Sequence, residues 1–276
     1  MPTLSQRLGL GRQARALVVT ADELGFCHAA NVGVFESLRS GGATSASLMV
    51  PCPWGREAAA RYRGEDVGVH LTLNADHRLY RWGPITHAPS LRGGDAGFPA
   101  TVEDFWDHAD LDETRRECRA QIERAILWGF DVSHLDAHLT TLQLRPEFFD
   151  VYLDLAVEFG LPMRMVSEHL EDLLGFPAAE LARSAGAIFC DRSVPFAHFA
   201  NPNGIESALD NLTPGVTEVH LRPAVDTPEL RSLAHDWEER VGDHKILCDV
   251  PNLARMAEKV GIAVIGFRAL RDLARR

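Results

Sequence analysis

Three segments that lie far apart in the chain each end an apolar run with a side chain that can bind a metal ion. They are residues 16–26 (ALVVTADELGF), 66–74 (DVGVHLTLN) and 132–141 (VSHLDAHLTT). A carboxylate or histidine at the end of a buried run is costly unless it has a partner, so three such runs indicate one shared polar centre. Glu23, His70 and His138 would supply one carboxylate and two imidazoles to it.

This combination of donors indicates the class of metal and the kind of site. Two histidines and one carboxylate suit zinc or another first-row ion and leave coordination positions open for water, which is typical of a catalytic centre. The same donors form the facial triad of non-haem iron oxygenases, so an oxygenase is a competing interpretation. Those enzymes are usually built on a double-stranded β fold, which the pattern of this chain does not support.

Each of these signals, taken alone, also has a structural explanation. Asp22 and Glu23 follow a strand and precede a helix, where an acidic residue often serves as the N-cap. A single histidine such as His70 in an apolar strand is commonly a hydrogen-bonded core residue. The spacing of His134 and His138 around Asp136 leaves the two interpretations evenly balanced. The joint occurrence of the three segments favours the metal site.

The bulk composition indicates one large domain and excludes several partners. The chain has 276 residues, 46% of them hydrophobic, and a net charge of −11. This size and apolar fraction allow one substantial core, and the negative charge argues against nucleic acid or an anionic membrane as a partner. Five cysteines without a CxxC pair indicate reduced thiols and a cytoplasmic protein. No apolar stretch approaches the length of a membrane span.

Strand-like and helix-like patterns alternate along the chain, which predicts an α/β fold with a largely parallel sheet. Strands are expected at 16–20, 45–50, 66–73, 133–136, 162–166, 186–190, 216–221 and 262–267. Helices are expected at 31–39, 54–62, 111–129, 146–159, 177–184, 229–241 and 250–260, with a short one at the C-terminus.

The number of these elements fits an irregular (β/α) TIM-like barrel better than an open nucleotide-binding sheet, because no GxGxxG follows the first strand. We expect a single domain over residues 15–276, preceded by a short N-terminal extension of residues 1–14. Residues 76–101 lack clear periodicity and are expected to form a long loop, either over a site or as a surface insertion. In a barrel, catalytic residues gather at the carboxyl ends of the strands, where Glu23, His70 and His138 would lie.

Three short motifs carry a resemblance to a known family. Residues 20–25 (TADELG) are similar to an NADDFG motif, residues 68–74 (GVHLTLN) to GxHLNLT, and residues 134–142 (HLDAHLTTL) to HxDSHHHVH. Further similarity includes residues 43–45, 161–165 and 218–224. In this order and spacing, the motifs resemble those of the YdjC-like (ChbG/HpnK) carbohydrate deacetylase family over most of the chain.

The resemblance implies an irregular TIM-like barrel that removes N-acetyl groups from a small amino sugar or glycoconjugate with the help of one divalent metal ion. The ion would be zinc or magnesium, or another first-row metal. The family's metal ligands correspond to Glu23, His70 and His138, and its general base corresponds to Asp22. The resemblance also suggests a homodimer.

The chain departs from the family pattern at several motif positions. Glu23 stands where the family usually has aspartate, and Ala137, Leu139, Thr140 and Leu142 replace polar residues of the third motif. Arg222 occupies the position of an expected catalytic histidine. Arginine stays protonated at ordinary pH and cannot donate a proton in turnover. An alternative is therefore a degenerate member that binds a carbohydrate or a partner without turnover.

His220 is a candidate to replace the missing histidine. Residues two apart in a strand face the same side, so His220 is expected to point with Arg222. We hypothesise that His220 is the general acid and that Arg222 binds an oxyanion or an acidic substrate group. Three further residues are expected to hold an imidazole in place or to bind substrate: Asp136, His134 and Arg164.

Overall fold

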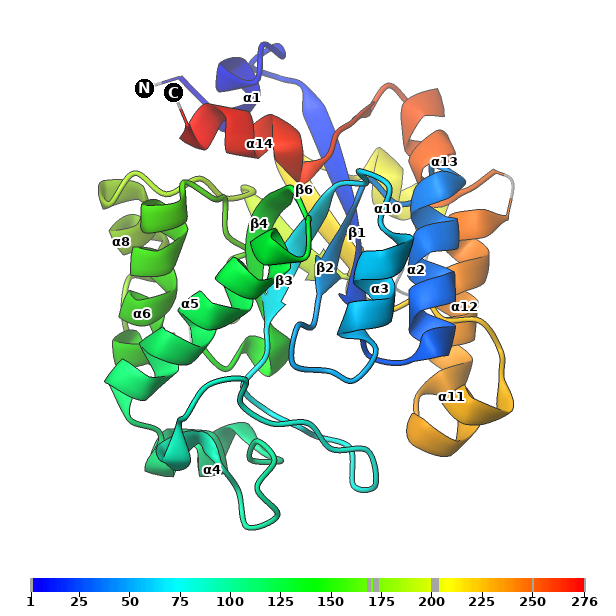
Figure 1. Cartoon of the computed structure of the whole chain (residues 1–276). Helices are drawn as coiled ribbons and strands as arrows, with labels where there is room; N and C mark the ends of the chain where they lie inside the picture. Colours follow the sequence, from blue (N-terminus) through cyan, green and yellow to red (C-terminus); the bar gives the residue numbers. More distant parts are fainter. Residues whose placement is uncertain (1, 168–169, 171–173, 200–203, 250, 276) are drawn as a thin grey trace.

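A curled parallel sheet forms the centre of the molecule (Figure 1). The computed structural model describes residues 2–167, 170, 174–199, 204–249 and 251–275. Within this part of the chain the strands are β1 (Arg15–Leu24), β2 (Ser45–Leu48), β3 (Val67–Leu71), β4 (Val132–Ala137), β5 (Arg192–Pro195), β6 (Gly215–Leu221) and β7 (Ala263–Val264). Their order is β4-β3-β2-β1-β6-β5, with β7 also paired to β1, and every pair is parallel.

Strand β1 lies in the middle of the sheet and is buried on both faces. Every residue from Ala16 to Leu24 is buried, which explains the continuous apolar run in the sequence. The carboxyl ends of parallel strands meet at the same edge of a sheet. Thr20 on β1 pairs in register with His220 on β6, and His70 on β3 pairs with Asp136 on β4, so the predicted site residues share this edge.

Most helices surround the sheet on its outer side, while α1 and α14 lie at the end where the termini are and α4 lies near the opposite end (Figure 1). They are α1 (Leu4–Arg7), α2 (His28–Arg39), α3 (Gly55–Arg61), α4 (Val102–His108), α5 (Leu111–Leu127), α6 (Pro146–Phe159), α8 (Ala178–Ser184), α9 (Phe196–Phe199), α10 (Gly204–Asp210), α11 (Pro228–Leu233), α12 (Trp237–Cys248), α13 (Leu253–Lys259) and α14 (Phe267–Ala274). Local signals explain several boundaries. Asp110 caps α5, and α6 begins at Pro146 and ends at Gly160, which is left-handed.

The expected irregular (β/α) barrel is confirmed as a curled half-barrel within one α/β domain. Among the described residues, the sheet continues beyond β4 through short contacts: Leu135 forms a bridge with Met163, whose backbone N–H donates to the carbonyl of Ile188 at 2.9 Å. None of the described helices is long and apolar enough to cross a lipid bilayer.

Three expected elements were wrong. Residues 162–166 form one isolated bridge instead of a strand, and the strand expected at 186–190 begins only at Arg192. The helix expected over 229–241 is two helices, α11 and α12, separated by Ala234 in an extended conformation. In each case the apolar pattern of the sequence is similar on both sides of the observed end of the element. The position of that end therefore depends on contacts with residues distant in the chain.

The N-terminal residues contact the domain that follows them. Leu4, Leu8 and Leu10 pack against a second apolar cluster that contains Phe267 and Leu270 of α14. Figure 1 shows both termini at this end of the molecule. The predicted division at residue 14 stays a prediction.

The loop of residues 76–101 lies at the opposite end from the termini, next to the carboxyl edge of the sheet (Figure 1). Its regular structure is one 3-10 turn, η1 (Pro89–Leu91). Carboxylates of α5 bind its backbone: Glu117 accepts from the N–H groups of Ile85 and Thr86, and Glu113 accepts from that of Ser90. The middle of the loop is therefore anchored to α5.

Candidate active site

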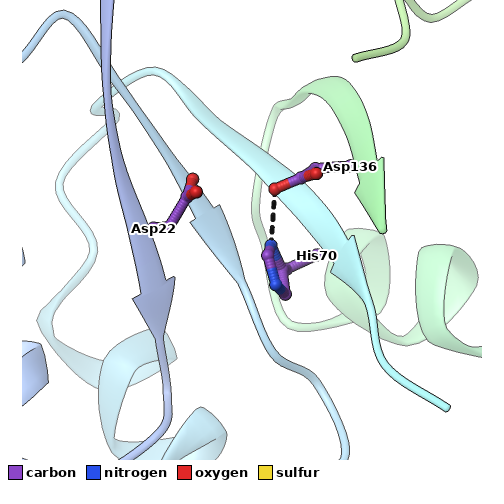
Figure 2. A group of neighbouring side chains, drawn as sticks. All are labelled: Asp22, His70 and Asp136. Carbon is purple, nitrogen blue, oxygen red and sulfur yellow. Dashed lines mark hydrogen bonds and ion pairs between the residues drawn. The ribbon is translucent and has the colours of Figure 1, made fainter. Parts of the chain in front are cut away.

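Asp22, His70 and Asp136 come together from β1, β3 and β4 at the carboxyl edge of the sheet (Figure 2). All three are buried, and each offers one possible ligand atom within 4.8 Å of the others, a group that could hold a metal ion. His70 Nδ1 lies 2.5 Å from Asp136 Oδ2, the contact drawn in Figure 2. The Ser47 hydroxyl donates to Asp22 Oδ1 at 2.9 Å and lies 3.0 Å from His70 Nδ1, so it joins the members of the group.

Arg164 is the cation that balances this carboxylate cluster. Its guanidinium donates to both oxygens of Asp22 at 2.8 and 2.9 Å, and to Asp136 Oδ2 at 2.6 Å. It also donates twice to Glu218 Oε1, at 2.7 and 2.9 Å. One buried arginine thus pairs with three buried carboxylates. Such an arrangement is stable only when each charge has a hydrogen-bonding partner.

The electrostatics keep the two site aspartates ionised. Burial by itself would raise the pKa of Asp22, but Arg164 and then His220 outweigh it and hold that pKa well below its ordinary value. The pKa of Asp136 is likewise lowered against the effect of burial, by Arg164 and by His70. Burial would lower the pKa of His70, but its carboxylate neighbours, Asp136 foremost, raise it.

His70 and His138 face each other through their inner ring nitrogens. His70 Nε2 lies 3.1 Å from His138 Nδ1, while the outer nitrogens contact carboxylates: His70 Nδ1 contacts Asp136, and His138 Nε2 contacts Asp76 at 3.0 Å. Carboxylates accept hydrogen bonds, so these partners assign a hydrogen to each outer nitrogen. The inner nitrogens then present two lone pairs to each other, which is unfavourable unless a proton or a cation lies between them. This donor arrangement fits a divalent metal ion.

Glu23 is paired with Arg240 and does not belong to the group that Asp22, His70 and Asp136 form. Its backbone is left-handed, with φ of 66°, and its Oε2 accepts from Arg240 Nη1 at 2.6 Å. Burial would raise the pKa of Glu23, but Arg240, Arg222 and His138 together lower it. The carboxylate is thus ionised, while its role as a metal ligand stays a prediction.

His220 and Arg222 contact different carboxylates, although the strand pattern predicted a common side. His220 Nδ1 lies 3.4 Å from Asp22 Oδ2, inside the carboxyl edge of the barrel. Arg222 pairs with Asp236 at 2.9 Å and with Glu239 at 3.6 Å, on the α12 side. The expectation was wrong because β6 ends at Leu221, so strand alternation does not extend to residue 222.

His134 lies deeper in the barrel than the other predicted residues. Its ring is fully buried, stacks on Phe267 with centroids 3.8 Å apart, and lies 2.9 Å from the Ser133 hydroxyl. Burial, followed by Arg164, lowers the pKa of His134 to about 3, so the ring is neutral. A neutral ring at this depth fills the barrel interior.

Backbone strain gathers around the predicted ligands. Glu23 itself, and Leu139 and Thr140 directly after His138, all have positive φ angles. The left-handed conformation is unfavourable for residues other than glycine, and especially for a β-branched residue such as threonine. Strained residues persist where the surrounding structure enforces them, often at functional sites.

Several residues of the site were not singled out by sequence reasoning. Glu218 is a charged residue within the apolar run of β6. A charged or histidine side chain in an apolar run is also what marked the segments of Glu23, His70 and His138. Ser47 and Asp76 have no local signal, because their roles come only from contacts with residues distant in the chain. Arg240 occupies an ordinary position on a polar helix.

The structure predicts a pH-dependent stability effect at Asp243, next to Arg222. Asp243 Oδ2 accepts from the backbone N–H of Arg222 at 2.8 Å, and burial raises the pKa of Asp243 to about 6. The unfolded chain releases this proton near pH 4, so the residue lowers stability as the pH rises from about 4 to 6. We expect Asp243→Asn, which keeps an acceptor oxygen, to raise the free energy of unfolding at pH 8 by about 1–3 kcal/mol.

Urea denaturation at several pH values checks this expectation. The gain should vanish near pH 4, where the folded wild-type carboxyl is already protonated. Asp226→Asn is the matched control, because Asp226 pairs with Arg231 on the surface and its loss should change stability by less than about 0.5 kcal/mol. A loss of stability in Asp243→Asn at pH 8 would contradict the assignment.

Comparisons with known proteins give the family of the chain. A family model described as "YdjC-like protein" matches residues 16–258. A protein of Thermus thermophilus named "Carbohydrate deacetylase" is 36% identical over 249 residues, which are 87% of this chain and 89% of that protein. A protein of the same name from Geobacillus stearothermophilus is 29% identical over 259 residues, 92% and 97% of the two chains.

A solved structure shares the fold. It is the crystal structure of a putative cellobiose-phosphate cleavage protein from Enterococcus faecalis, with a TM-score of 0.79 and 23% sequence identity. The match covers 93% of this chain and 99% of that one. Because the family model matches most of the chain and a relative exceeds 30% identity over most of its length, this chain belongs to the YdjC-like protein family.

Proposed function

We propose that this protein is a metal-dependent hydrolase that removes an N-acetyl group from a small amino sugar or glycoconjugate. The observation that carries the proposal is the facing pair of His70 Nε2 and His138 Nδ1, each ring backed by a carboxylate. Curated relatives named carbohydrate deacetylase support the choice of reaction.

His70, His138 and Glu23 would hold the metal ion. The alternative position, between Asp22 and Asp136, is already taken by a positive charge, since Arg164 Nη1 lies 2.8 and 2.6 Å from oxygens of the two carboxylates. A second cation there would be repelled. A bound divalent ion, zinc or magnesium, would polarise the acetyl carbonyl and lower the pKa of a water molecule towards neutrality.

Asp22 would act as the general base. Arg164 binds both of its oxygens and Ser47 binds Oδ1, so the carboxylate is ionised and held in one orientation. It can accept the proton that the attacking water loses.

His220 would supply the proton that the leaving amine needs. Its Nδ1 lies near Asp22 Oδ2, and its side chain keeps 24% of its exposure, so it is open to a substrate at the edge of the barrel. Histidine is the side chain best suited to give and accept protons near neutral pH. A carbohydrate-binding protein without turnover is the alternative that Arg222 suggested, and the position of His220 beside Asp22 argues against it.

Metal analysis and acetate release test the proposal. We expect the purified wild-type protein to hold about one metal ion per chain and to release acetate from at least one of a panel of N-acetylated amino sugars. The double variant His70→Ala/His138→Ala should lose both properties. His108→Ala, at an exposed histidine paired with Asp104, is the control and should keep them.

The proposal fails if the wild-type protein binds no metal after reconstitution with zinc, cobalt or magnesium. It also fails as a hydrolase if the metal-loaded protein releases no acetate from the panel. The cellular site that we propose is the cytoplasm, which the five free cysteines support. The homodimer stays a prediction.

A further inference from the structure

Asp76 contacts His138 but has no role in the proposed reaction. It is the first residue of the 76–101 loop, and its Oδ1 lies 3.0 Å from Nε2 of His138. The His138 side chain is almost fully buried, whereas that of Asp76 keeps 31% of its exposure. The loop thus adds a carboxylate to a histidine that belongs to the strand edge of the barrel.

The backbone around Asp76 is attached on both sides of this contact. Ala75 N–H donates to the carbonyl of Pro99 at 2.9 Å, which closes the base of the loop. The Asn74 side chain accepts from the Thr141 hydroxyl at 2.5 Å, and Thr141 follows the turn that carries His138. The carboxylate and its histidine are therefore held in one hydrogen-bonded unit.

Trp82 of the same loop packs next to the imidazole. Its ring centroid lies 6.5 Å from that of His138, and its indole N–H donates to the carbonyl of Asn74 at 2.8 Å. The hydrogen bond to residue 74 fixes the Trp82 indole. The loop therefore both limits the position of the His138 ring, through Trp82, and binds its Nε2, through Asp76.

We propose that Asp76 is a positioning residue that holds His138 in the tautomer with its hydrogen on Nε2, leaving Nδ1 free to face His70 Nε2. The role of Asp76 in metal binding rests on the proposed function, whereas its effect on the tautomer of His138 does not. Asp136 performs the same task for His70 from within the sheet. For His138 the task falls to the loop, so the affinity of the site for metal depends on how the loop is anchored.

The chemistry explains why this contact matters. A neutral imidazole carries one hydrogen, and its other nitrogen is the metal donor. Without the Asp76 carboxylate, the hydrogen of His138 is free to move to Nδ1, where it points at His70 and blocks the donor atom. Carboxylates that bind the far nitrogen of a metal-ligating histidine raise affinity by about 10–100-fold.

The test compares Asp76→Ala, Asp76→Asn and the control Asp95→Asn. Asp95 lies in the same loop and pairs with Arg81, away from the histidines. The first measurement is the ¹⁵N shifts of the His138 ring in metal-free protein, which report the tautomer. The second is the dissociation constant for Zn²⁺, obtained by competition with a chelator. Unfolding curves show whether each variant is folded.

We expect the wild-type ring to carry its hydrogen on Nε2 and Asp76→Ala to lose that preference and bind Zn²⁺ about 10–100-fold more weakly. Asp76→Asn keeps a neutral acceptor, so it should restore the tautomer and part of the affinity. Asp95→Asn should match the wild type. A hydrogen on Nδ1 in the wild type, or an unchanged tautomer and affinity in folded Asp76→Ala, would overturn the proposal. If the wild type binds no Zn²⁺, the proposed function fails, while the ring shifts still decide the role of Asp76.

Discussion

Replacing Arg164 with methionine is expected to lower the free energy of unfolding at pH 7 by about 3–5 kcal/mol. The substitution keeps most of the apolar stem but leaves three buried carboxylates, Asp22, Asp136 and Glu218, without their cation. Removing one partner of a buried ion pair is costly because the remaining charge is neither solvated nor paired. Urea denaturation at pH 7 measures the loss.

The pH dependence gives this prediction a second check. The folded-state pKa values of Asp22 and Asp136 are lowered, so their contribution is fully present above the unfolded value of about 4 and is lost as the pH falls further. The difference between wild type and variant should therefore narrow in acid. Arg115→Met, which removes an exposed pair with Asp154, is the control and should cost less than about 1 kcal/mol. If Arg164→Met lowered the free energy of unfolding by as little as the control does, the ion pairs of Arg164 with Asp22, Asp136 and Glu218 would not be stabilising.

Replacing His220 with glutamine is expected to lower kcat for deacetylation by about 10²–10⁴-fold, the range that general acid–base residues usually contribute. Glutamine is of similar size and polar, but it cannot carry the proton to the leaving amine. Because His220 contacts Asp22 and not the facing histidines, metal content and the dissociation constant for Zn²⁺ should stay within about twofold of wild type.

Steady-state kinetics on an acetate-releasing substrate, with metal analysis of the same samples, separate the possibilities. His244→Gln is the matched control, since this histidine of α12 pairs with Glu36 of α2. Full activity in His220→Gln would exclude His220 as the acid. Loss of activity together with loss of metal would instead indicate that the substitution disturbs the metal site.

The positioning of the site depends on pairings that span large parts of the chain. Arg164 and Asp22 are separated by 142 residues, and His138 and Asp76 by 62. Neither Asp76 nor Ser47 could be identified from its surroundings in the sequence, because polar residues after strands and in loops are common. Their roles follow only from which side chains the barrel brings within hydrogen-bonding distance.

Some expectations failed for the same reason. The strand expected at 162–166 is reduced to one bridge at Met163, because strand formation depends on neighbours that only the tertiary structure supplies. His134 and His138 lie four residues apart in one motif, yet one packs on Phe267 and the other faces His70. Strand alternation did not extend to Arg222, because β6 ends one residue earlier.

By itself the sequence determined the alternation of strands and helices, the irregular barrel class and the segments that carry the site. These follow from apolar periodicity, local caps and the cost of placing charges at the ends of buried runs. Only the tertiary structure decided which nitrogen of each histidine faces its partner, which carboxylates share Arg164, and which cation holds Glu23. Those outcomes depend on distances of about 3 Å between side chains that are far apart in the sequence, and no local pattern specifies such distances.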